Sequence, residues 1–352
     1  MPTMNFASDN WAGAHPAISK HLLEASAGFS APYGASELDR KIEQRFNELF
    51  EREVAVYFVS TGTAANSLAL AAVNRPGGVS FCHREAHILE DECGAPEFFT
   101  HGARLAPVDG DNGKIDPHNL KAEIKRFPPG FIHAGQPMAI SITQATEIGT
   151  LYQPDEIAAI ADIAKSYGLP LHMDGARFAN ALVAMKLTPA EMTWKQGVDI
   201  VSFGATKNGC WCAEALVFMN PESAKDLPFI RKRAAQLLSK SRFVACQFDA
   251  YLHDELWLVL ARHANAMAER LLNGIVNSKN ARLAWHPEAN EVFAILDKAQ
   301  ADQLQEKGAV FYQWNPPRAK PSLLNQNEVL VRLVTSFATE DDQVDRFLEL
   351  LG

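Results

Sequence analysis

The chain has 352 residues, of which 47% are apolar and 21% charged, a balance typical of a globular protein long enough for two domains. This composition excludes disordered, collagen-like and coiled-coil proteins. The formal charge of −9, from 33 basic and 42 acidic side chains, repels nucleic acids and anionic membranes, so we expect neither as a partner.

The apolar runs and the cysteines indicate the compartment. Polar residues interrupt every apolar run short of the ~20 residues that a membrane helix needs, and MPTMNFASDNWAG lacks the pattern of a signal peptide. We therefore expect a soluble, cytoplasmic protein. Five cysteines without CxxC spacing indicate neither a disulfide framework nor a zinc site, and buried reduced thiols are the simpler interpretation. They are Cys82, Cys93, Cys210, Cys212 and Cys246.

Short apolar, β-branched runs alternate with helical patterns from Val54 onward. This alternation predicts βα units on a mostly parallel sheet. The clearest helix is predicted at 154–168, with a proline at its start, acidic residues in its first turn and Gly168 as its stop. The predicted strands are 54–59, 79–82, 104–108, 138–143, 169–174, 199–206 and 214–219.

After about residue 225 the pattern changes to long helical stretches, from Phe229 through roughly Leu272. The Pro, Asn and Lys content of 315–328 indicates an exposed loop. We expect a small α+β domain at 251–352, after an N-terminal segment and a large domain at 1–250. Within the small domain we predict strands at 291–297, 309–314 and 328–337, and helices at about 299–307 and 340–351.

An anion site is predicted after the first strand of the large domain. No strand is followed by GxGxxG, and no GxxxxGK[ST] occurs, so a dinucleotide or a P-loop nucleotide is disfavoured. The turn STGTAAN at 60–66 opens an apolar helix, and the N–H groups of Gly62 and Thr63 could hold one phosphate there. The alternative is that Thr61 or Thr63 only caps the helix.

Two later strands end in residues that suit a cofactor. In LPLHMDGARF a strand ends at Asp174, whose carboxylate could keep a proton on a heterocyclic nitrogen, and Arg177 could hold a carboxylate. The alternative is a surface pair of Asp174 and Arg177. In FGATKNG a strand ends near Lys207, flanked by Thr206, and a desolvated lysine can lose its proton and form a Schiff base with an aldehyde. Because ligands bind at the carboxyl edge of such sheets, these residues in this order indicate a pyridoxal-phosphate site.

Five motifs in order extend this pattern over nearly the whole chain, between NFASDN at 5–10 and VRLVTS at 331–336. They are STGTAAN (60–66), AHILEDECGAPEF (86–98), ITQATEIG (142–149), HMDGARF (172–178) and FGATKNG (203–209). On these motifs the chain resembles the low-specificity L-threonine aldolases, which are β-eliminating lyases among the fold type I, aspartate-aminotransferase-like pyridoxal-phosphate enzymes. The resemblance implies a mixed, mostly parallel seven-stranded sheet, pyridoxal 5′-phosphate as cofactor and no metal.

The resemblance also implies roles for single residues in the cofactor site. Lys207 matches the lysine that binds the cofactor covalently, and Asp174 the carboxylate that pairs with the pyridine nitrogen. His87 matches the histidine that stacks on the cofactor ring near the substrate hydroxyl. The phosphate-binding turn corresponds to Gly62 and Thr63. Thr206 beside the lysine and Arg177 are also expected to contact the cofactor.

Substrate and subunit contacts follow from the same resemblance. Arg177, Arg332 and Ser8 match groups that orient the substrate carboxylate. Tyr33 matches a tyrosine that the neighbouring subunit supplies, in a homodimer or homotetramer with shared active sites. In the basic segment 231–242, Arg233 or Lys240 would reach a partner's phosphate, and a solvated basic helix face is the alternative.

Several histidines remain to be assigned. Where several members of the family carry a second active-site histidine, this chain reads Thr143-Gln144-Ala145-Thr146. His83, His133 and His172 lie near motifs, and we expect them to be structural.

The resemblance implies cleavage of L-threonine, L-allo-threonine and related β-hydroxy amino acids to glycine and an aldehyde. His87, directly or through a water, is the expected base for the β-hydroxyl proton. Another pyridoxal-phosphate β-eliminating lyase acting on an amino acid, or a transaminase, is the nearest alternative, because the fold alone does not exclude it. A catalytically silent binding protein is disfavoured by the complete set of site residues, and a dehydrogenase by the missing glycine fingerprint.

Overall fold

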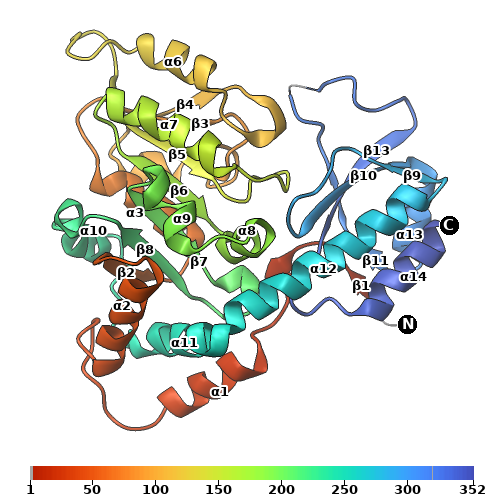
Figure 1. Ribbon diagram of the computed structural model, residues 1–352, viewed down its shortest axis with the longest axis horizontal. Helices are drawn as coiled ribbons and strands as arrows, with labels where there is room; N and C mark the ends of the chain where they lie inside the picture. Colours follow the sequence, from red (N-terminus) through yellow and green to blue (C-terminus); the bar gives the residue numbers. More distant parts are fainter. Residues whose placement is uncertain (1–2, 319) are drawn as a thin grey trace.

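A seven-stranded sheet forms the centre of the larger part of the molecule (Figure 1). The computed structural model describes residues 3–318 and 320–352. The strand order is β2-β8-β7-β6-β5-β3-β4; β8 runs antiparallel to both of its neighbours, and the other pairs are parallel. The strands are β2 Ala55–Val59, β3 Gly78–His83, β4 Arg104–Val108, β5 Gln136–Thr143, β6 Leu171–Gly175, β7 Ile200–Gly204 and β8 Glu214–Phe218. The mostly parallel sheet expected from the sequence is thus confirmed.

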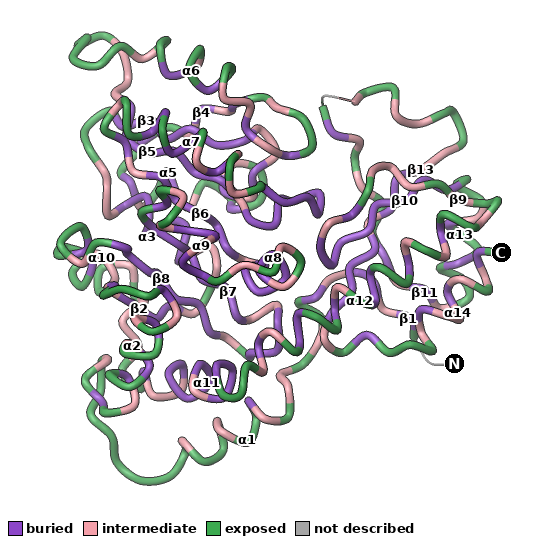
Figure 2. The backbone as a smooth tube through the Cα atoms, viewed as in Figure 1, coloured by how far each residue is buried: buried purple, intermediate pink, exposed green. Residues whose placement is uncertain are grey.

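Helices cover both faces of this sheet because helical crossovers between its strands bury apolar side chains against it. Figure 2 shows the inner strands of this sheet, from β8 to β3, largely buried and the loop at 26–33, between the first two helices, exposed. The helices are α1 Pro16–Ala25, α2 Glu37–Leu49, α3 Gly62–Ala72, α4 His87–Glu90, α5 Ala95–Phe99, α6 Pro117–Lys125, α7 Pro154–Ser166, α8 Phe178–Met185, α9 Pro189–Met192, α10 Leu227–Arg233 and α11 Arg242–Leu252.

A smaller antiparallel sheet, of order β12-β13-β10-β9, forms the second part of the molecule. The long helix α12 Leu256–Asn277 runs from the region of the large sheet to this smaller one (Figure 1). The other elements here are β9 Ala281–Leu283, β10 Glu291–Asp297, β12 Tyr312–Trp314, β13 Glu328–Val334, α13 Lys298–Glu306 and α14 Asp341–Leu351. The domain boundary after residue 250 stays a prediction.

The N-terminal strand β1 Met4–Asn5 pairs with β11 Ala309–Val310 in a parallel two-stranded ladder. Phe6 follows β1, is fully buried, and packs edge-on against Phe347 of α14. The chain then continues to Asp9, which contacts Arg177 at the large sheet, so residues 4–10 connect the two parts of the molecule.

The long helical stretches expected from Phe229 to about Leu272 are present as α10, α11 and α12, with positive φ angles at Ala235 and Asp254 between them. One predicted strand is not continuous. The run expected as one strand at 309–314 is divided into β11 and β12 by Phe311, which is buried in the small core. Of the loop predicted at 315–328, Ala319 lies outside the described residues.

The cysteines only partly match the expectation of buried thiols. All five are free; Cys82, Cys210 and Cys246 are buried as expected, whereas Cys93 is exposed and Cys212 partly exposed. Within the described residues, no helix combines the length and the apolar content that crossing a bilayer requires.

Candidate active site

A cavity of about 320 Å³ lies at the carboxyl edge of the large sheet, within the range of small-molecule sites. Because β2 and β5 to β7 run in the same direction, the residues that follow them meet at one edge, as the sequence predicts. Among the residues that line it are Gly62, Thr63, His87, Asp174, Arg177, Thr206 and Lys207. All seven residues expected to contact the cofactor therefore share one cavity.

The start of α3 forms the anion-binding end of this cavity. Thr61 is the N-cap, and its side chain accepts a hydrogen bond from the Ala64 N–H at 3.1 Å, so Thr61 does cap the helix. The N–H groups of Gly62 and Thr63 lie in the first turn, where no intrahelical acceptor is available. A Cβ added at Gly62 would meet nothing within 4 Å, so its backbone faces open space. These N–H groups and the helix dipole suit a phosphate.

Lys207 follows β7 in a single 3₁₀ turn, Thr206–Asn208. The next side chain anchors this turn, because the Asn208 amide donates to the Tyr251 hydroxyl at 2.7 Å and to the Trp257 carbonyl at 2.8 Å. Burial lowers the pKa of the Lys207 ammonium, the positive charge of Arg177 lowers it further, and nearby carboxylates only partly oppose them. The amine therefore loses its proton more readily than a solvated lysine, as a nucleophile for an aldehyde requires.

Asp174 belongs to a buried polar chain that reaches His87. Its Oδ2 accepts from the Asn66 amide at 2.7 Å, and its Oδ1 accepts from the Ala176 N–H at 3.0 Å. The same Asn66 amide also donates to Glu92 at 2.8 Å, and the Glu92 carboxylate lies 2.9 Å from Nδ1 of His87. Asp174 is thus fixed through both oxygens at the floor of the cavity.

The Glu92 contact decides which nitrogen of His87 is available. An ionised Glu92 only accepts hydrogen bonds, so Nδ1 of His87 carries the proton and Nε2 is the free acceptor in the neutral ring. This hydrogen bond is the main reason that the pKa of His87 is raised above its usual value. The imidazole of His87 is therefore mostly neutral, and able to accept a proton, only at a higher pH than a solvated histidine requires.

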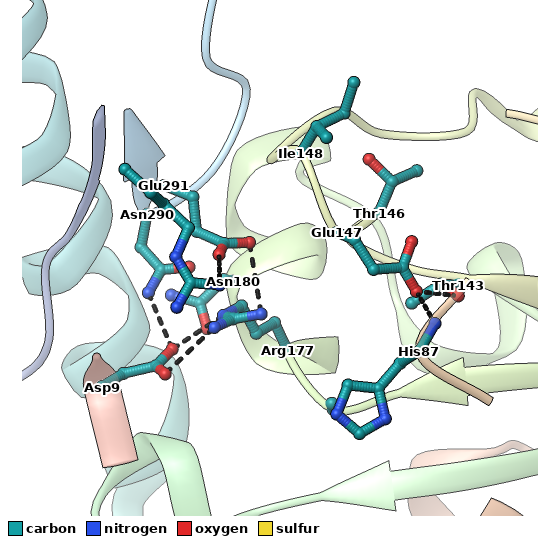
Figure 3. Close-up of polar contacts among 12 residues, drawn as sticks. Asp9, His87, Thr143, Thr146, Glu147, Ile148, Arg177, Asn180, Asn290 and Glu291 are labelled. Carbon is teal, nitrogen blue, oxygen red and sulfur yellow. Dashed lines mark hydrogen bonds and ion pairs between the residues drawn. The ribbon is translucent and has the colours of Figure 1, made fainter. Parts of the chain in front are cut away.

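Arg177 is bound to protein carboxylates (Figure 3). Its Nε and Nη2 donate to the two oxygens of Asp9 at 2.7 and 3.0 Å, and its Nη1 lies 3.2 Å from Glu291. The alternative of a surface pair with Asp174 is wrong, because Arg177 is buried and pairs with Asp9 instead. Arg332 lies on the far side of Glu291, with its Nη1 3.8 Å from that carboxylate.

Glu147 directly follows Thr143-Gln144-Ala145-Thr146, the segment in which several members of the family carry a second active-site histidine. One of its oxygens accepts from the His87 N–H and from the Thr143 hydroxyl, each at 2.8 Å (Figure 3). The other oxygen is buried and has no hydrogen-bond partner among the described residues. Burial raises the pKa of Glu147 to about 7.

Glu147→Gln is expected to change how stability depends on pH. Because the folded pKa of about 7 exceeds the unfolded value of 4.5, folding favours the protonated form, and the wild type loses stability as the pH rises from about 4.5 to 7. The loss is about 3 kcal/mol at most. Glutamine keeps the acceptor oxygen but cannot ionise. The difference in melting temperature, variant minus wild type, should therefore increase from pH 5 to pH 8. Parallel melting curves across this range would contradict the assignment.

Ser8, Tyr33 and Arg332, which were predicted to bind substrate, are not among the residues that line this cavity. The Ser8 hydroxyl caps the short turn Asp9–Trp11 by accepting from the Asn10 N–H at 3.1 Å. Tyr33 is half exposed, and the Lys232 ammonium lies over its ring.

The basic segment and the remaining histidines have different environments. Arg233 and Lys240 are exposed, whereas Arg231 folds back over the Tyr57 ring. His172 is structural as expected, since it contacts two serine hydroxyls and burial lowers its pKa to about 4. His83 is structural too, through the Gly110 carbonyl and the Glu85 N–H.

Several residues of the site were not predicted from the sequence. Asn66 lies within the STGTAAN motif and Glu92 within AHILEDECGAPEF, so the motifs themselves could have indicated both. Asp9 lies within NFASDN and Glu147 within ITQATEIG, but neither motif indicates the distant partners of these carboxylates, Arg177 and the His87 N–H. Glu291 lies outside the motifs, and no local pattern distinguishes it.

The arrangement fits pyridoxal phosphate: N–H donors at a helix start for the phosphate, a buried amine for the aldehyde and a fixed carboxylate for the ring nitrogen. The fold and the site define a pyridoxal-phosphate-dependent enzyme of fold type I. Residues 5–299 match the beta-eliminating lyase family, and the chain belongs to this family.

Known proteins resemble the chain along its length. A protein of Pseudomonas aeruginosa named low specificity L-threonine aldolase is 41% identical over 311 residues, 88% of this chain and 89% of that protein. A solved structure of Leishmania major threonine aldolase is 30% identical, with a TM-score of 0.91 over 99% of this chain and 98% of that one. The structure of mouse CSAD, 15% identical with a TM-score of 0.77 over 99% of this chain and 84% of that one, shares the fold.

Proposed function

We propose that this protein is an L-threonine aldolase, which cleaves L-threonine, L-allo-threonine and related β-hydroxy-α-amino acids to glycine and an aldehyde. The observation that carries this proposal is the convergence of Lys207, Asp174 and His87 on one cavity. The names of the Pseudomonas and Leishmania relatives support the reaction.

Four groups of the chain would hold the cofactor. The amine of Lys207 would bind its aldehyde carbon, and the N–H groups of Gly62 and Thr63 would bind its phosphate. Asp174 would keep the proton on its ring nitrogen, and His87 would lie against the ring. When bound, the cofactor supplies an electron sink for the electron pair of the Cα–Cβ bond that breaks.

The remaining groups would orient the substrate and move its proton. Arg332 would bind the substrate carboxylate, because its Nε is buried without a hydrogen-bond partner among the described residues. Arg177 would complete this subsite together with Ser8, which precedes Asp9 in the sequence. Nε2 of His87, directly or through a water, would accept the β-hydroxyl proton, which orients the Cα–Cβ bond for cleavage.

The purified enzyme should show a visible absorption band from the lysine-bound cofactor, and L-threonine should give acetaldehyde and glycine in equal amounts. Both are measured on one sample, by its spectrum and by an aldehyde assay. Ammonia or a keto acid in place of acetaldehyde would favour another pyridoxal-phosphate β-eliminating lyase or a transaminase. A protein that shows no band after adding pyridoxal phosphate would contradict the cofactor site.

We also infer that the enzyme is a cytoplasmic homodimer or homotetramer with shared active sites. The exposed loop at 26–33 carries Phe29 and Tyr33, both exposed in the single chain. An apolar exposed loop of this kind is typical of a surface that a second copy covers. In such an assembly Tyr33 and one of Arg233 or Lys240 would reach the neighbouring cavity.

A further inference from the structure

Glu291 is a buried carboxylate that faces two arginines. It is the first residue of β10 and has no exposed surface. One of its oxygens lies 3.2 Å from Arg177 and the other 3.8 Å from Arg332 (Figure 3 shows the Arg177 side). Neither oxygen accepts a hydrogen bond from a described residue.

The fold fixes Glu291 in this position. On β10 and β13, Phe293 is paired with Arg332, so Glu291 lies diagonally across from the arginine. The backbone of Gly149 packs so closely on Glu291 that a Cβ at Gly149 would come within 2.7 Å of the Glu291 carbonyl oxygen. The backbone of Glu291 therefore has little room to shift towards Gly149 when a ligand arrives.

The charges of this cluster balance before any substrate binds. Arg177 and Arg332 contribute two positive charges, and Asp9 and Glu291 contribute two negative ones. A substrate carboxylate would add a further negative charge to a buried, neutral set. Burying an uncompensated charge is costly, so a proton taken up by one of the two carboxylates would lower the energy of the complex.

The contacts show which carboxylate takes the proton more easily. Asp9 accepts two hydrogen bonds from Arg177 and one from Asn290 at 3.1 Å. Although burial alone raises the pKa of Asp9, the charges of Arg177 and Lys207 and these hydrogen bonds lower it overall. At Glu291 burial raises the pKa, and the two arginines do not cancel the effect.

We propose that Glu291 is the internal counter-ion of Arg177 and Arg332, and that it takes up a proton from solvent when a substrate carboxylate binds these arginines. This rests on the proposed function, in which the arginines bind the amino acid. The other ionisable groups that act on Glu291 are Asp9 and Lys207, and Glu147 acts on Arg177. Glu291 is thus a positioning residue that makes substrate affinity depend on pH.

Two effects of known sign follow from this role. In the wild type, affinity for a carboxylate ligand without an ammonium group, such as acetate, should fall by about tenfold per pH unit between the pKa of Glu291 in the free protein and its higher pKa in the complex. Glu291→Gln keeps the size of the side chain and removes its charge. The variant should bind glycine more tightly than the wild type at pH 8.5, by about tenfold or more, and KM for L-threonine should fall in parallel while kcat changes little.

Calorimetry of the holoenzyme with glycine measures the proton uptake directly. Glycine carries the carboxylate but has no β-hydroxyl group, so it binds without cleavage. Titrations in buffers of different ionisation enthalpy give the number of protons exchanged. Any proton released by the glycine ammonium is common to both proteins, so the wild type should take up about one proton more than Glu291→Gln. Glu306→Gln, exposed on α13, is the matched control and should behave as the wild type.

Each outcome decides the proposal. Equal proton numbers in the wild type and Glu291→Gln, or weaker glycine binding by the variant at every pH, would show that Glu291 only orients the arginines. If the variant does not fold, a pH-independent affinity of the wild type for acetate, a carboxylate with no ammonium proton to release, would overturn the proposal by itself. A wild type that takes up the proton with glycine but forms no acetaldehyde from L-threonine would overturn the proposed function alone.

Discussion

Lys207→Ala is expected to abolish acetaldehyde formation from L-threonine, with a loss of at least about 1,000-fold in kcat. The variant lacks the buried amine that would bind the cofactor aldehyde covalently, and its visible band should disappear with the activity. The fold should persist, because the turn is anchored by the hydrogen bonds of Asn208 rather than by the lysine.

The control for this prediction is Lys165→Ala, which removes an exposed lysine from α7. Its activity, spectrum and melting temperature should match those of the wild type. Near-normal cleavage by Lys207→Ala, with a melting temperature close to the wild type, would overturn the assignment of the reactive amine. If Lys207→Ala loses both activity and fold, the test is the spectrum of Lys207→Arg, which keeps a positive charge but has no reactive amine. The visible band should be absent from that variant as well.

Asp174→Asn is expected to lower kcat by about 100-fold or more while weakening cofactor binding far less. Asparagine retains an oxygen that accepts hydrogen bonds from Asn66 or Ala176, so the cavity should keep its shape. It has no negative charge to keep a proton on the ring nitrogen, and the electron sink is weakened. The phosphate contacts at Gly62 and Thr63 are untouched by the change.

Titration of the apoenzyme with pyridoxal phosphate, followed by its absorbance, gives the affinity, and aldehyde release gives kcat. An equal loss of both would show that Asp174 is structural. The charge of Asp174 also raises the pKa of His87, so the activity that remains in Asp174→Asn should rise with pH at a lower pH than in the wild type. Asp162→Asn, exposed on α7, is the matched control.

The sequence predicted the large sheet well because its strands are short apolar runs bounded by turn residues, a local signal. The strand predicted at 104–108 has the bounds of β4, and the one at 291–297 those of β10. The helical stretch after residue 225 was predicted without its breaks, since they depend on single left-handed residues such as Ala235 that apolar periodicity does not reveal.

The residues of the candidate site were likewise predictable only in part. Lys207 and Asp174 were predictable because each follows a strand, and parallel strands bring such residues to one edge. The role of Asp9 was not predictable, because its partner Arg177 is distant in sequence and the pair forms only in the complete fold. The resemblance pointed instead to Ser8, its neighbour in the sequence.

The connection that residues 4–10 make has a consequence for the order of folding. Met4 pairs with Ala309, and Asp9 reaches Arg177, so these contacts close very long loops. Loops of this length form slowly because chain entropy opposes their closure. During synthesis β6, which carries Asp174, and the turn with Lys207 emerge long before β11, β10 or β13. The cofactor half of the site can therefore assemble first, and the arginine cluster is completed only after β10 and β13 have been made.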